Sequence, residues 1–167
     1  MEIFDASTDN ISIIQSIAFR SWQETYRGII SEEQIEYMLD KMYSTDALIE
    51  QMDILKHRFV LIRREGASSF EGFVSYETNY KNTSTTKLHK LYLLPTSQGC
   101  GLGRSLIETV CDRAKKNGNQ TVGLNMNRKN KALRFYQNMG FDIIGEEDID
   151  IGNGYLMEDY IFAKRVE

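Results

Sequence analysis

A glycine-rich turn between an apolar run and an amphipathic segment constrains this chain more than any other feature. The turn reads Gln98-Gly99-Cys100-Gly101-Leu102-Gly103-Arg104. The apolar run at 88–95 predicts a strand before it, and the pattern from Ser105 onward predicts a helix after it. Glycine lets backbone N–H groups turn toward a ligand, and a helix N-terminus adds unpaired donors and partial positive charge. We therefore expect this turn to bind a phosphate-bearing molecule.

Three phosphate-binding patterns compete for the turn. The dinucleotide fingerprint requires G-x-G-x-x-G and a later acid, but the glycines stand at 99, 101 and 103, and residues 121–124 hold no acid. The nucleotide P-loop requires Gly-Lys-Ser/Thr, which is absent. The third pattern, Gln/Arg-x-x-Gly-x-Gly/Ala, is matched by Gln98, Gly101 and Gly103. In this respect the turn resembles the pyrophosphate-binding motif of the GCN5-related N-acetyltransferases (GNAT). A tight strand-to-helix connection without a ligand is the simpler alternative.

A second block, at 125–141, resembles the next motif of the same family. It combines a polar turn rich in asparagine, a short helix with a Phe135-Tyr136 pair, and a terminal Gly140-Phe141. Ala132, Phe135, Tyr136 and Met139 fall on one helical stripe, and Gly140 suits the position that closes a helix. Two blocks in the family's order strengthen the resemblance.

The resemblance extends over the whole chain, as a single N-acetyltransferase domain spanning residues 1–167. Residues 21–34 resemble the family's two substrate-side helices, and residues 150–164 are similar to the last strands of the PaiA-like, polyamine-acetylating branch. The implied fold is α/β: a mixed, mostly antiparallel sheet, one parallel strand pair that splays apart, and helices on both faces. A final strand exposed at the sheet edge would offer a route to a homodimer.

Composition supports one ordinary globular domain and excludes several classes. The chain has 167 residues, of which 41% are hydrophobic, and no apolar run reaches membrane-spanning length. With no signal peptide and two cysteines outside any disulfide framework, we expect a cytoplasmic protein with reduced thiols. The net charge of −4 argues against nucleic-acid binding and suits a cationic substrate, although a solvated acidic surface explains it equally well. The two histidines, His57 and His89, are far apart in sequence and predict no metal site.

Element signals are clear in most of the chain. Helices are predicted from Thr8 or Asp9 to about residue 26, after Ser31, after Ser44 or Thr45, over 102–117 and around Tyr136. Strands are predicted at 59–63, 70–80, 87–94, 121–126, 142–148 and 156–164, with the first two forming a hairpin.

The resemblance implies acetyl-coenzyme A as co-substrate and assigns the residues that bind it. Its pyrophosphate would lie on the glycine turn, and its pantetheine arm would pair with strand backbone where a bulge opens the sheet. An asparagine near residue 130 would contact the arm, with Asn127 and Asn125 as fallback and helix capping as the alternative role for Asn130. The implied cofactor-binding residues are Leu91, Tyr92, Leu93, Gln98, Gly99, Cys100, Gly101, Leu102, Gly103, Arg104, Ser105, Asn125, Asn130 and Tyr136.

The resemblance also suggests how protons move. Tyr136 stands at the family's general-acid position and would protonate the leaving thiolate, because a phenol keeps its proton at neutral pH. His89 stands where relatives often carry a glutamate base, and its titration range suits proton transfer. A packed core aromatic and a structurally bonded histidine are the alternative roles. Glu24, Glu77 and Glu147 are further candidate bases, as is a water chain.

The acceptor side is the least determined. Trp22, Tyr26 and Tyr37 would form an aromatic wall, and Glu24 and Glu77 would supply carboxylates for an ammonium group, although Trp22 fits core packing at least as well. The leading interpretation is acetyl transfer to a primary amine such as a small polyamine, by direct attack. A protein N-terminus or lysine, another acyl donor, and a non-catalytic acetyl-coenzyme A sensor remain alternatives. No nucleic acid, membrane or metal is expected to take part.

Overall fold

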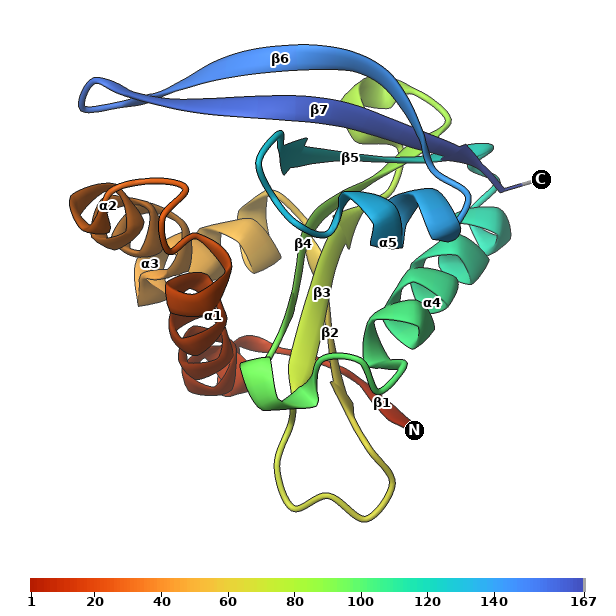
Figure 1. Cartoon of the computed structure of the whole chain (residues 1–167). Helices are drawn as coiled ribbons and strands as arrows, with labels where there is room; N and C mark the ends of the chain where they lie inside the picture. Colours follow the sequence, from red (N-terminus) through yellow and green to blue (C-terminus); the bar gives the residue numbers. More distant parts are fainter. Residues whose placement is uncertain (167) are drawn as a thin grey trace.

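A mixed sheet of seven strands is the centre of the computed structural model, which describes residues 1–166 (Figure 1). In spatial order the strands are β1 (Glu2–Asp5), β2 (Arg58–Arg63), β3 (Gly72–Glu77), β4 (Thr85–Leu93), β5 (Thr121–Asn127), β7 (Tyr155–Arg165) and β6 (Asp142–Gly152). Neighbouring strands are antiparallel except β4 and β5, which run parallel. The predicted fold class is confirmed.

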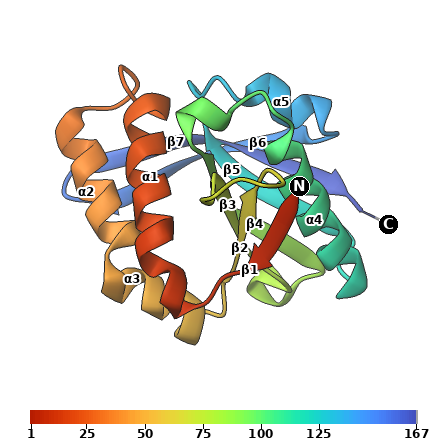
Figure 2. The ribbon, with the colours of Figure 1, turned by 90° about the horizontal axis from the view of Figure 1, so that it is seen from below.

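Helices cover both faces of this sheet. One face carries α1 (Ile11–Thr25), α2 (Glu32–Tyr43) and α3 (Thr45–Ile49), and the other carries α4 (Leu102–Lys116) and α5 (Leu133–Asn138). Figure 2 shows the first group on one side of the strands and α4 on the other. Short helical segments lie at Thr8–Asn10 (η1), Glu50–Ile54 (η2), Tyr80–Asn82 (η3) and Pro95–Ser97 (η4).

Strand alternation explains the two layers. Along β2, Val60 and Ile62 face the core beneath α4, whereas Phe59 and Leu61 face the core beneath α1 to α3. All four side chains are at most 2% exposed, so β2 is buried on both faces, as a continuous apolar run predicts. The two cores are separated by the sheet, and the strands between them hold both helix layers in place.

Side-chain caps start the substrate-side helices. The backbone N–H of Gln34 donates to Ser31 Oγ, and that of Ala47 donates to Ser44 Oγ, so both predicted caps are present and Ser44 rather than Thr45 serves. The first helix is capped at Ser7 instead of Thr8 or Asp9, through a short helical turn that precedes α1. Each cap satisfies an N–H that the helix itself leaves unpaired.

The parallel pair β4–β5 opens halfway. The two strands pair from Thr85↔Thr121 to Leu88↔Leu124 and no further. On its other edge β4 contains a bulge, because Tyr76 of β3 pairs with Leu88 and Ser75 pairs with Lys90, which leaves His89 without a partner. A bulge bends the strand that carries it. The predicted bulge and splay are therefore confirmed.

Three features of the sheet differ from what the sequence predicted: an additional strand, the bounds of β3 and the position of the final strand. Strand β1 was not predicted, because four mostly exposed residues carry no alternation. Strand β3 runs from Gly72 to Glu77 rather than over 70–80, since Asn79 adopts a left-handed backbone conformation and Tyr80 begins the short helical segment η3. The prediction that the final strand is an exposed edge is wrong: β7 lies between β5 and β6, and the edges are β1 and β6.

The described residues also bear on two compositional expectations. Cys100 and Cys111 are both free thiols, the first exposed and the second buried. Within residues 1–166, no helix combines the length and apolar character needed to cross a membrane.

Candidate active site

A cavity of about 960 Å³ opens where β4 and β5 separate. Its lining comes from α1, the open ends of β4 and β5, the glycine turn before α4, the segment leading into α5, and the β6–β7 hairpin. The tip of that hairpin lies over α2 (Figure 1), held where Tyr37 Oη donates to the carbonyl of Ile151 at 2.9 Å. Residues far apart in the chain thus share one hollow.

The glycine turn forms one end of the cavity. Gly99 and Gly101 have φ of +78° and +81°, which only glycine adopts without strain. Helix α4 has no side-chain hydrogen bond at its N-terminus, in contrast to α2 and α3, so its first N–H groups remain available to a ligand. A Cβ at Gly103 would lie 3.2 Å from the Phe135 ring, so this glycine allows α4 to pack against α5.

The open edge of β4 provides the next part. Leu91, Tyr92 and Leu93 line the cavity beyond the last β4–β5 pair, and their main chain pairs with β3 on the opposite side only. An extended molecule with amide groups can therefore hydrogen-bond to the cavity side of β4 as a further strand would.

Tyr136 reaches the cavity from α5. Its ring is 7% exposed and packs edge-on against Phe135 and Phe141 at centroid distances of 5.1 and 5.9 Å. The side chain lines the cavity. Burial raises the pKa of Tyr136, so the phenol holds its proton throughout the neutral range. The ring of Tyr136 thus packs with other aromatic side chains, while its hydroxyl could serve as the predicted proton donor.

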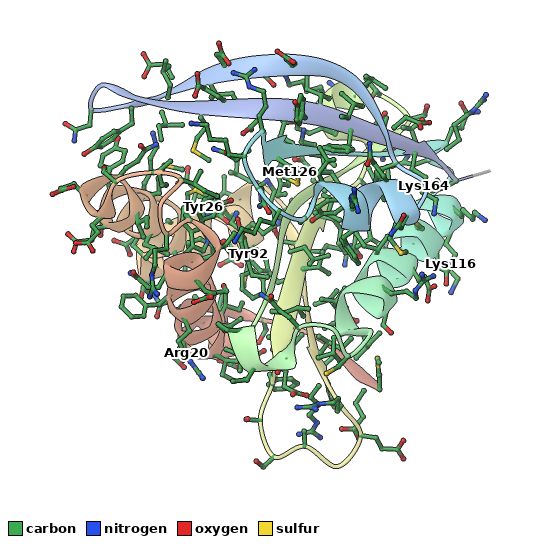
Figure 3. The ribbon with its side chains drawn as sticks, in the orientation of Figure 1. Arg20, Tyr26, Tyr92, Lys116, Met126 and Lys164 are labelled. Carbon is green, nitrogen blue, oxygen red and sulfur yellow. The ribbon has the colours of Figure 1, made fainter. Side chains whose placement is uncertain are left out.

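Two further phenols meet beside it. Tyr26, which follows α1, and Tyr92 of β4 point toward each other in Figure 3, with hydroxyl oxygens 3.1 Å apart. Trp22 packs against Tyr26 with the rings tilted at 41° and a centroid distance of 4.4 Å, is 1% exposed and also lines the cavity. Burial raises the pKa of both tyrosines. The predicted aromatic wall exists, and Trp22 belongs to it and to the core alike.

His89 lies at the bulge and is bonded on one side. Its Nε2 is 2.9 Å from Glu77 Oε2, and its ring stacks on His57 at a centroid distance of 4.0 Å. Burial, together with the charges of Lys90 and Lys87, lowers the pKa of His89 to about 3, so the ring is neutral at physiological pH. The bulge turns His89 toward the cavity that it lines.

The two histidines are far apart in sequence but adjacent in the structure, so their separation along the chain is not a valid argument against a metal site. His57, Glu77 and His89 lie together, with one potential ligand atom from each within 4.8 Å of the others. Two imidazoles and a carboxylate are ligand types that divalent metals accept. Two ammonium groups, of Lys87 and Lys90, lower the pKa of His89 electrostatically and would equally repel a metal cation. The expectation of no metal stays a prediction.

The asparagines divide their roles. Asn130 Oδ1 accepts from the backbone N–H of Ala132 at 2.9 Å, so the capping role is present, and the residue also lines the cavity. Asn127 Oδ1 accepts from the backbone N–H of Lys129 at 2.9 Å. Asn125 receives a hydrogen bond from Lys87 Nζ and donates to Glu147 Oε2 at 2.9 Å. All three asparagines line the cavity.

Most of the predicted site residues meet at the cavity. Among those predicted, Trp22, Glu24, Tyr26, His89, Leu91, Tyr92, Leu93, Gln98, Gly99, Gly101, Gly103, Arg104, Asn125, Asn130 and Tyr136 line it.

Six predicted residues do not line it. One of them, Glu147 of β6, accepts a hydrogen bond from the Asn125 side chain at 2.9 Å. Leu102 is wholly buried in the core, and Cys100 is exposed to solvent, so each has only main chain to offer in the turn. Ser105 donates to Met1 Sδ at 3.0 Å, Glu77 is behind His89, and Tyr37 is bonded to Ile151. Helix and turn geometry decide which neighbours face a ligand, and the linear pattern of a motif does not.

Sequence reasoning missed five charged residues of the lining, namely Arg27, Lys90, Lys129, Lys131 and Asp159. Lys129 and Lys131 flank Asn130, and the basic run Arg128-Lys129-Asn130-Lys131 directly after a strand was the available signal for an anion-binding role. Asp159 of β7 also lines the cavity and is 6% exposed. Its signal was an acid at a buried position within a predicted strand.

The family of the chain is given by comparison with family models. Residues 27–156 match the family model described as an acetyltransferase (GNAT) domain, so the chain belongs to the GNAT acetyltransferase family.

Several known acetyltransferases are similar to this chain in sequence or in structure. The chain is 28% identical over 166 residues to spermidine N(1)-acetyltransferase of Thermoplasma acidophilum, covering 95% of this chain and 96% of that protein. The crystal structure of the PaiA N-acetyltransferase of T. acidophilum with coenzyme A superimposes with a TM-score of 0.80 at 27% identity, over 98% of both chains. A ribosomal protein bS18-alanine N-acetyltransferase of Haemophilus influenzae is 34% identical over 68 residues, covering 41% of this chain and 43% of that enzyme. This protein is an acetyl-coenzyme A-dependent N-acetyltransferase.

Proposed function

We propose that the enzyme acetylates a primary amine of a small, polyamine-like molecule by direct attack while both substrates are bound. The observation that carries this proposal is the single cavity, which joins the glycine turn and open β4 edge to the wall of Trp22, Tyr26 and Glu24. Because donor and acceptor groups share one hollow, no acetylated enzyme intermediate is needed to bring them together.

The donor would occupy the end that the glycine turn forms. Main-chain N–H groups of the turn and the first turn of α4 would hold the pyrophosphate, and the cavity edge of β4 would hold the pantetheine amides. Lys129 and Lys131 add positive charge to the lining near Asn130. Acetyl-coenzyme A supplies the activated acetyl group as a thioester, whose carbonyl the N–H groups of β4 would polarise.

Tyr136 would act as the general acid. Its raised pKa keeps the hydroxyl protonated, and its place on the cavity wall suits donation to the thiolate that departs. A buried phenol in water-poor surroundings is also a stronger hydrogen-bond donor than one in bulk water.

His89 would accept the proton that the amine loses. It is neutral, lines the cavity, and has Glu77 at 2.9 Å to stabilise the imidazolium as it forms. The pKa of about 3 means that the imidazole does not retain a proton, so it would pass the proton on toward Glu77, which is partly exposed.

The acceptor preference follows from charge and from one relative. Aromatic faces beside a carboxylate favour an ammonium group, and the T. acidophilum relative over nearly the whole chain bears the name of a spermidine acetyltransferase. A protein N-terminus is the second candidate, because the H. influenzae relative is named for alanine at the N-terminus of a ribosomal protein.

A panel of acceptors tests the proposal. The enzyme with acetyl-coenzyme A is offered spermidine, 1,4-diaminobutane, a free amino acid, an aminoglycoside and an alanine-starting peptide, and product mass and thiol release are recorded. Acetylation of the di- and polyamines with the highest kcat/KM is expected. Transfer to the peptide alone would overturn the small-amine proposal, and tight donor binding with no transfer to any acceptor would favour a sensor.

A further inference from the structure

Asp159 is a buried acid with an unused hydrogen-bonding atom. It is 6% exposed, and its Oδ1 is buried without a hydrogen-bond partner in the part of the chain that the structure describes. An unpaired buried carboxylate oxygen is costly, because it gives up hydration and gains nothing in return. Such an atom on a cavity wall points to a ligand that completes it.

Asp159 lies on the part of the cavity wall that we assign to the acceptor. It lies on β7 opposite Asn127 of β5 and Glu147 of β6, and its charge adds to burial in raising the pKa of Tyr26, which follows α1. Met157, two residues earlier on the same face of β7, also lines the cavity. The wall therefore presents one carboxylate beside apolar surface.

That apolar surface is built of side chains that suit an alkyl chain. Met38 and Met42 of α2 and Ile149 and Ile151 of β6 line the cavity around Met157. These flexible and branched side chains can enclose methylene groups, whereas a strongly hydrated acceptor would gain little from them.

The charges around Asp159 leave its carboxylate only partly compensated. Burial raises the pKa of Asp159, and the negative charge of Glu147 adds to this rise, whereas a hydrogen bond from the Asn125 side chain and the charges of Lys87 and Arg128 lower it. Arg128 is engaged by Glu146, Asp148 and Glu158 on the hairpin, and Lys87 donates to Asn125. Neither cation forms a salt bridge with Asp159 itself among the described residues.

We propose that Asp159 binds a second, non-reacting ammonium group of the acceptor, which makes the acceptor a diamine or polyamine. This rests on the proposed function and assigns its specificity. A carboxylate against the reacting nitrogen would hold that nitrogen in its protonated, non-nucleophilic form. Against a distant ammonium the same carboxylate costs nothing in reactivity and orients the chain so that its other end meets the thioester.

The test compares Asp159→Asn with Glu158→Gln, a matched neutralisation of the preceding residue, whose side chain lies on the opposite, exposed face of β7. Each variant is assayed with 1,4-diaminobutane and with 1-aminobutane, which differ by one ammonium group. Asp159→Asn should lower kcat/KM for the diamine by about 10- to 150-fold, the usual range for a charged hydrogen bond, and for the monoamine by less than about 3-fold. Glu158→Gln should change neither.

Equal losses for both amines, or no loss for the diamine, would overturn the proposal. Thermal unfolding separates a structural role: removing an unpaired buried charge should keep or raise Tm, so a lower Tm with equal losses also counts against binding. Asp159→Ser repeats the comparison should Asp159→Asn fail to fold.

Calorimetric binding of 1,4-diaminobutane to the coenzyme A-loaded protein keeps this inference separate from the proposed function. If the wild-type enzyme acetylates neither amine, diamine binding that Asp159→Asn weakens and Glu158→Gln does not still supports the subsite. Binding that is absent, or unchanged in Asp159→Asn, refutes it.

Discussion

Replacing Gly101 by alanine should weaken donor binding through backbone strain alone. Gly101 has φ of +81°, and a Cβ built there would have one neighbour within 4 Å, the flexible end of Met1 at 3.4 Å. Steric clash is therefore small, and the cost is that of placing an L-residue in the left-handed region, about 1–2 kcal/mol. The variant can avoid this cost by relaxing the turn, but then the N–H groups no longer converge.

The magnitude follows from which state bears the strain. If the turn relaxes in the free protein and donor binding restores it, the strain energy weakens the free energy of binding by the same amount. The Kd for coenzyme A then rises by about 5- to 30-fold. If the turn stays strained in both states, Kd is unchanged and Tm falls by roughly 2–8 °C, as expected for a domain of this size. Calorimetric titration with coenzyme A and thermal unfolding together distinguish the two cases.

Gly118→Ala provides the matched control. Gly118 has φ of +79° with no atom within 4 Å of its Cβ position, and it follows the opposite end of α4. It should show a similar loss in Tm and an unchanged Kd. Equal changes in Kd in both variants, or an unaltered Kd in Gly101→Ala without a fall in Tm, would refute the assignment of the glycine turn to the donor.

Three further outcomes are expected. Tyr136→Phe should lower kcat by about 10²- to 10⁴-fold while the Kd for coenzyme A, measured by calorimetry, stays within about 3-fold, because only the acid is lost; full turnover would remove Tyr136 from the chemistry. His89→Ala should reduce kcat by a similar factor at every pH from 6 to 9, and wild-type rates should show no imidazole titration near pH 6.5, since the pKa of His89 is about 3; unchanged rates in the variant would exclude His89 as the proton acceptor. Glu71, whose pKa is lowered to about 2 mainly by hydrogen bonds from Arg64, stabilises the fold above its unfolded pKa near 4.5, and this contribution is lost as pH falls toward 2. Glu71→Gln should therefore lower Tm by roughly 2–12 °C at pH 7 and by progressively less below pH 4.5; a constant difference across that range would contradict this linkage.

Local patterns predicted the elements that carry the donor site. The run 88–95, the glycine turn and the amphipathic segment after it correspond to β4, the turn and α4. Each depends on nearest-neighbour chemistry: buried alternation, positive φ at glycine and an uncapped helix start. Ser31 and Ser44 were predictable as caps for the same reason.

Residues that meet through the sheet were not predictable from spacing. His57 and His89 stack because β2 and β4 both pair with β3, and the bulge at His89 brings their rings together. Asp159 reaches the cavity because β7 inserts between β5 and β6 rather than extending the sheet. Strand order depends on long-range packing, which one sequence does not record locally.

The unmatched residue in β4 has a consequence for what this enzyme tolerates. Deleting His89 would give β4 and β3 a regular register, and regular ladders are straighter and pair more completely. The two parallel strands would then tend to zip along their full length and seal the hollow between them. The irregular register thus keeps the cavity open at the expense of strand pairing that a regular sheet would have.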